Sequence, residues 1–128
     1  NLLVSVVNQP TRQVTYEMSW SGSMPQQKSR IIYLESAKVD ILSIAGFHLE
    51  KVGSQSTRKI TDTMIGSIDR LASFPLMGPI HPDPVLSARG YRKLVTMEPY
   101  VCIYKVFPDA ITIYRIVNGA TDYPRLLM

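Results

Sequence analysis

Residues 91–117 read YRKLVTMEPYVCIYKVFPDAITIYRIV, and this stretch contains three β-type runs separated by very short joints. The first run covers residues 91–97, the second covers residues 100–107 and the third covers residues 110–117. Apolar and polar side chains alternate in the last two runs, as they do in strands that bury one face. Joints this short connect antiparallel neighbours, so the stretch predicts an antiparallel meander.

A helical hairpin is predicted before the meander. Ser36 can cap a first helix, whose apolar stripe consists of Val39, Leu42, Ala45 and Leu49, widened by Ile41, Ile44 and Val52. Gly53 ends that helix. In a second helix, one face carries Ile60, Met64, Ile68 and Leu71. With a β-rich run at residues 30–34, the order predicts an α+β fold, in which an N-terminal strand and a helical hairpin pack on a small twisted antiparallel sheet.

A loop rich in proline and glycine joins the second helix to the meander. It runs from Phe74 to Ala88, and its prolines argue against any helix or central strand there.

The first 23 residues differ in character from the rest of the chain. Val14, Tyr16, Met18 and Trp20 alternate with polar residues, which predicts a strand with one apolar face. Ser21-Gly22-Ser23 is typical of a flexible linker, and Met24 resembles a translation start. We therefore divide the chain into a segment at 1–20, a linker at 21–23 and a domain at 24–128. The segment is either an expression tag or a partner peptide, and its apolar face favours the peptide.

Composition excludes several classes of protein. The 128 residues are 45% hydrophobic and 19% charged, which fits one globular domain and argues against a disordered chain. The sequence contains no apolar run of the ~20 residues that span a bilayer. The single cysteine and the absence of a Cys/His cluster argue against a structural disulfide or zinc site. We expect a cytoplasmic protein that needs no metal or cofactor.

The strongest candidate binding surface is a cluster of cations around a tyrosine. Arg89, Tyr91, Arg92 and Lys93 can contact phosphates or an acidic protein, and the net charge of +4 favours an anionic partner. The alternative is a solvated basic edge strand. Standard catalytic motifs are absent from the sequence, so the catalytic residues stay unknown, with His81, Asp83 and Arg92 as weak candidates.

Residues 28–127 resemble the RelE/ParE toxins of bacterial type II toxin–antitoxin modules. The resemblance rests on Arg-Gly-Tyr-Arg-Lys-Leu-Val at 89–95, on Pro-Tyr-Val-Cys-Ile-Tyr-Lys-Val at 99–106, on the stretch from Ile111 to Leu127 and on residues 68–75. It implies a cytosolic toxin that a cognate antitoxin neutralises, with higher-order toxin–antitoxin assembly. It also gives residues 1–20 a role as an antitoxin fragment.

The two branches of this family imply different activities. ParE-like members inhibit DNA gyrase, whereas RelE-like members cleave mRNA on the ribosome with a catalytic arginine, at whose position this chain has Val101. Thr121 also stands where an arginine is usual, while Pro82-Asp83-Pro84 resembles a Pro-Glu-Pro motif of another branch. The sequence therefore favours gyrase inhibition, with mRNA cleavage and a non-toxic binding partner as alternatives. Tyr123 and Arg125 near the C-terminus are further candidate target contacts.

Overall fold

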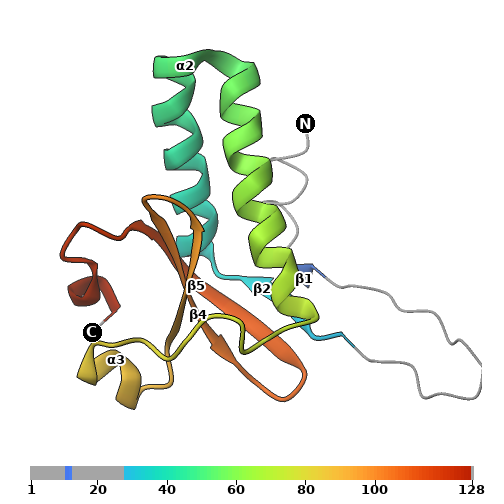
Figure 1. Cartoon of the computed structure of the whole chain (residues 1–128), viewed down its shortest axis with the longest axis vertical. Coiled ribbons are helices and arrows are strands. Elements are labelled where there is room, and N and C mark those ends of the chain that lie inside the picture. The colour runs from blue at the N-terminus through green and yellow to red at the C-terminus, as the bar shows by residue number, and fades with distance from the viewer. Residues whose placement is uncertain (1–10, 13–27, 128) are drawn as a thin grey trace, which may run out of the picture.

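A computed structural model describes Thr11–Arg12 and residues 28–127 of the chain (Figure 1). The elements, in chain order, are β1 (Thr11–Arg12), β2 (Arg30–Tyr33), α2 (Glu35–Asp69), the 3-10 helix η1 (Arg70–Ala72), α3 (Pro84–Ala88), β3 (Arg92–Met97), β4 (Tyr100–Val106), β5 (Ala110–Asn118) and the 3-10 helix η2 (Tyr123–Leu127). The predicted α+β fold is confirmed.

The long element α2 consists of two helical arms. Gly53 lies inside it with φ 80° and ψ 175°, a backbone conformation that glycine adopts without strain. The chain reverses at this residue, and Figure 1 shows the two arms side by side, with their joint at the end away from the sheet. The predicted hairpin is therefore confirmed, including the glycine at its joint.

The strands form one sheet in the order β1-β2-β5-β4-β3. β3, β4 and β5 pair as the predicted antiparallel meander. β2, however, runs parallel to β5, from Arg30 opposite Ala110 to Tyr33 opposite Ile113. The sheet is therefore mixed where an antiparallel sheet was expected. Parallel strands need a long connection, which the hairpin and the meander supply between β2 and β5. The short joints that predicted antiparallel pairing lie within the meander, so they do not determine the direction of β2.

The main apolar core lies between the hairpin and one face of the sheet. Its buried residues come from α2, η1 and three strands: Ile31, Tyr33, Ala37, Ile41, Met64, Ile65, Ile68, Leu71, Ala72, Cys102, Tyr104, Ile111, Ile113 and Ile116. The second arm of α2 faces inward as predicted, because Met64 and Ile68 are almost completely buried. This core joins the hairpin to the sheet.

The first arm of α2 corrects the predicted apolar stripe. Ile41 and Ala45 are buried, but Val39, Leu42 and Leu49 are 52%, 48% and 52% exposed. Apolar residues surround much of this arm, so helical periodicity alone does not select the side that meets the sheet. Polar contacts to β5 determine which side of the arm meets the sheet.

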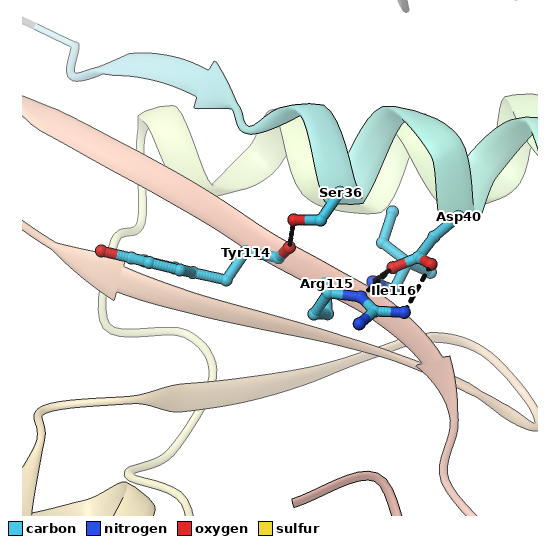
Figure 2. Close-up of polar contacts among 5 residues, drawn as sticks. All are labelled: Ser36, Asp40, Tyr114, Arg115 and Ile116. Carbon is cyan, nitrogen blue, oxygen red and sulfur yellow. Dashed lines mark hydrogen bonds and ion pairs between the residues drawn. The ribbon is translucent and has the colours of Figure 1, made fainter. Parts of the chain in front are cut away.

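These contacts close the outer edge of β5 where β2 has ended (Figure 2). The Ser36 hydroxyl donates to the Tyr114 carbonyl at 2.7 Å. Asp40 Oδ2 accepts from the Ile116 backbone N–H at 2.9 Å, and the same carboxylate binds the Arg115 guanidinium at 2.7 and 2.9 Å. The contacts pair backbone groups that a longer β2 would otherwise pair, and they fix the rotation of the arm.

The opposite face of the sheet carries a smaller apolar cluster: Leu86, Tyr91, Val101, Ile103, Val117 and Tyr123. Leu86 belongs to α3, which corrects the prediction that the proline-rich loop contains no helix. Pro84 stands in the first turn, where a missing N–H costs nothing. The Asp83 carboxylate caps this turn by accepting from the backbone N–H groups of Val85 and Leu86 at 2.9 and 3.1 Å.

Candidate functional site

Most of the predicted target-binding residues meet on the face opposite the hairpin. Tyr91 and Tyr123 belong to the apolar cluster of that face, and strand register sets Lys93 opposite Ile103 of the same cluster. Arg89 Nη1 donates to a backbone carbonyl of η2 at 3.1 Å. β3 and η2, which are distant in sequence, therefore contribute to one surface.

Lys105 extends this surface through contacts with two tyrosines. Its Nζ lies 4.4 Å from the centroid of the Tyr91 ring and 5.3 Å from that of Tyr114. The two rings meet edge to face, with centroids 5.1 Å apart. Burial, together with the adjacent Tyr91, raises the pKa of Tyr114, so its hydroxyl stays protonated at neutral pH. The aromatic faces hold the ammonium group in place without neutralising its charge.

We refer to Arg89, Tyr91, Lys93, Lys105 and Tyr114 as the basic–aromatic patch. Within residues 28–127, none of the three cations of the patch forms an ion pair. Arg115, on the neighbouring strand, differs because its bond to Asp40 neutralises its charge and raises the pKa of Arg115. The uncompensated positive charge suits an anionic partner surface.

His81 lies beneath η2 and is only 4% exposed. Its Nδ1 accepts the backbone N–H of Asp83 at 3.0 Å, and its Nε2 lies 2.6 Å from the Tyr123 hydroxyl. Burial, and to a smaller extent the positive charge of Lys93, lowers the pKa of His81, while Asp83 opposes the shift. The imidazole is therefore neutral at pH 7 and fully engaged in hydrogen bonds.

Arg92 is the predicted contact that the structure separates from the others. Strand register sets it opposite Tyr104 of the main core, so its side chain points to the hairpin side of the sheet. Its Nε donates to the Gly78 carbonyl at 2.7 Å, and the Tyr104 hydroxyl accepts the Gly78 N–H at 2.9 Å. A Cβ at Gly78 would lie 2.4 Å from the Lys93 carbonyl oxygen, so this close approach requires glycine.

Lys105 and Tyr114 belong to this site but were not among the predicted target-binding residues. Lys105 comes close to Tyr91 because β3 pairs with β4 in a register that sets Arg92 opposite Tyr104. Tyr114 lies on β5 where the pairing of β4 with β5 shifts its register, between Ile103 and Tyr104. The basic and aromatic composition of these strands was the available signal, but pairing register was needed to bring the side chains together.

The predicted antitoxin-segment contacts, Val14, Tyr16, Met18 and Trp20, lie outside the described residues, as does the linker at 21–23. The part of the segment that is described is β1. It runs antiparallel along the outer edge of β2, with Thr11 opposite Ile32 and Arg12 opposite Ile31.

In the described ranges, no three His, Cys, Asp or Glu side chains are grouped so that they could share a metal ion. Across those same residues, no helix combines the length and the hydropathy that a bilayer crossing requires.

Comparison with known proteins places the chain in a family. Residues 31–123 match the family model described as the ParE toxin of the type II toxin–antitoxin system parDE. A solved structure, the chromosomal ParDE toxin–antitoxin system from P. aeruginosa, matches with a TM-score of 0.61 and 20% identity, covering 72% of this chain and 96% of that chain. The structural likeness supports the fold. A search of the curated proteins finds no match. Because the family model covers most of the chain, this protein belongs to the ParE toxin family of type II toxin–antitoxin systems.

Proposed function

We propose that this protein is a cytoplasmic, growth-arresting toxin that inhibits DNA gyrase and is neutralised by a cognate antitoxin. The observation that carries the proposal is the ParE family match across residues 31–123, which includes the hairpin, the meander and the start of η2. The basic–aromatic patch is the proposed contact surface for gyrase, together with Arg125 of η2, whereas Tyr123 is buried and supports η2 from beneath. The uncompensated cations and the tyrosines of the patch are residue types that anchor protein interfaces.

The geometry favours binding over RNA cleavage. His81 is buried and hydrogen-bonded on both ring nitrogens, Asp83 caps α3, and Arg92 donates to the Gly78 carbonyl. Val101, at the position of the nuclease arginine, is buried in the apolar cluster. An mRNA endonuclease needs free acid–base groups and a charge that stabilises the phosphate in the transition state. These side chains instead serve to hold the proline-rich loop and η2.

The N-terminal segment is proposed to be an antitoxin-derived strand. A peptide that adds to a sheet edge pairs its backbone there, while alternate side chains fill pockets. Two other sheet edges are already occupied. α2 closes the edge of β5 beyond the end of β2, and the Lys93 N–H on the outer edge of β3 donates to the Pro79 carbonyl at 3.0 Å. The outer edge of β2 accepts β1, which supports strand addition at this edge.

A gyrase assay tests the function. Both apolar clusters come from residues 31–127, so we expect residues 24–128 to fold alone. We expect this domain to inhibit supercoiling of relaxed plasmid and to trap cleaved DNA, and we expect the full chain to inhibit less. In the same preparation, primer extension on ribosome-bound mRNA should show no new ends. Codon-positioned cuts with unaffected supercoiling would overturn the proposal in favour of a nuclease.

A further inference from the structure

The C-terminal element η2 is attached to the rest of the fold by few contacts. Tyr123 is 7% exposed and inserts into the apolar cluster, whereas Arg125 and Leu126 project outward. The backbone carbonyl of Leu127 accepts from Arg89. The Tyr123 hydroxyl reaches His81. Few buried contacts make a segment the first to open, so each anchor counts.

The hydrogen bonds of His81 fix its protonation state. The backbone N–H of Asp83 can only donate, so Nδ1 of His81, 3.0 Å away, must present a lone pair. In a neutral imidazole the proton then resides on Nε2, which donates to the Tyr123 hydroxyl at 2.6 Å. A second proton, on Nδ1, would oppose the Asp83 N–H and break this arrangement.

We propose that His81 is a positioning residue whose neutral Nε2–H form latches η2 onto the sheet and whose protonation releases it. The latch rests on the contacts described above. Its importance for the target rests on the proposed function, because η2 carries Arg125, an exposed side chain among the proposed gyrase contacts. The latch would hold Arg125 beside the basic–aromatic patch.

Three elements present titratable or charged groups to His81. Asp83 stands at the N-cap of α3, Lys93 lies on β3, and Tyr123 lies on η2. The pKa of His81 is lowered when the latch is closed and returns to about 6.5 when the side chain is released. Acid therefore favours the open form, and the latch weakens as the pH falls below about 6.5.

Limited trypsinolysis of the full chain tests the latch. Trypsin cleaves after accessible Lys and Arg residues, and the bond to follow is the one between Arg125 and Leu126. Mass spectrometry detects its cleavage as the loss of residues 126–128. Tyr123→Phe keeps the ring but removes the hydroxyl, so we expect cleavage to be roughly threefold to tenfold faster, as for one lost hydrogen bond. Tyr114→Phe is the matched control, because the Tyr114 hydroxyl makes no hydrogen bond within the described residues, and we expect no change.

The pH profile separates a positioning role from simple packing. Cleavage of the unmodified chain, corrected for the activity of trypsin on a peptide, should accelerate between pH 7 and pH 5.5. His81→Gln retains a donor and an acceptor but does not titrate, so we expect protection at pH 7 and a flat profile. Equal cleavage of the Tyr123→Phe chain and the unmodified chain, or a sloping profile in His81→Gln, would overturn the latch.

Gyrase inhibition by residues 24–128 carrying Tyr123→Phe tests the link to the target. Inhibition reduced at least threefold would support the link. An open latch with undiminished inhibition would retain the latch but refute its role in positioning target contacts. If the unmodified domain does not inhibit gyrase at all, the proposed function fails, while the trypsin result still decides the latch.

Discussion

The two faces of the sheet are built differently. The hairpin covers one face through a continuous core that joins α2, β2, β4 and β5. Among the described residues, the other face is covered by the short elements α3 and η2, and it is bordered by cations and tyrosines. Alternate residues of β4 contribute to the two faces: Cys102 and Tyr104 face the hairpin, whereas Val101 and Ile103 face η2. The difference indicates that one face supplies most of the stability, and the other is the face that we propose for binding.

The largest expected effect is on the hairpin face. Ile68 is fully buried, so Ile68→Ala should lower the free energy of unfolding by about 2–5 kcal/mol. Leu42→Ala, on the other arm of α2, removes a side chain that is 48% exposed and should cost less than about 1 kcal/mol. Urea denaturation measures both values. Similar losses for the two variants would show that the side of the first arm that carries Leu42 faces the core.

A smaller effect is expected where α2 closes the edge of β5. Asp40→Ala leaves Arg115 and the Ile116 N–H without their acceptor, and should cost about 1.5–3 kcal/mol. Asp122→Ala is the control, because it removes an exposed ion pair with Arg125 and surface pairs contribute about 0–1 kcal/mol to the free energy of unfolding. Thermal unfolding at low and high salt compares the two variants. An Asp40→Ala variant as stable as Asp122→Ala would remove the argument that this contact fixes the arm.

The smallest effect on stability is expected in the basic–aromatic patch. Lys93→Ala combined with Lys105→Ala removes two charges that form no ion pair within residues 28–127, and loses mainly the contact of Lys105 with its tyrosines. We expect a cost of about 0.5–1 kcal/mol, in line with a partly exposed cation–π contact. Chemical denaturation at pH 7 measures this cost. A loss above about 2 kcal/mol would mean that these lysines belong to the structural framework.

The sequence predicted those features that depend on local signals. Apolar periodicity and Gly53 located the hairpin, and the short joints at 98–99 and 108–109 located the meander. Features that depend on distant partners were missed. The pairing of β2 with β5 is parallel, and the rotation of the first arm is set by Asp40 on Ile116, which no periodicity in α2 encodes.

The candidate site shows the same division. The cluster at Arg89, Tyr91 and Lys93 is visible in the sequence because its members are neighbours in the chain. Lys105 joins it only through strand register, and Arg92 leaves it because successive residues of a strand point to opposite faces. His81 was a weak catalytic candidate in the proline-rich loop, and the structure buries it beneath Tyr123. Burial of a loop residue depends on the rest of the fold.

The most direct test of the account compares charge reversals on the two sides of the molecule. Residues 24–128 would carry either Lys93→Glu with Lys105→Glu on the patch, or Arg58→Glu with Lys59→Glu on the exposed surface of the hairpin. Both pairs change the net charge equally, so nonspecific electrostatic effects on the gyrase supercoiling assay are matched. We predict that the patch variant needs at least tenfold more protein for half-inhibition, while the hairpin variant stays within about twofold of the unmodified domain, as expected when a few central side chains dominate binding. Loss of inhibition in the hairpin variant, with the patch variant fully active and both variants folded, would contradict the account.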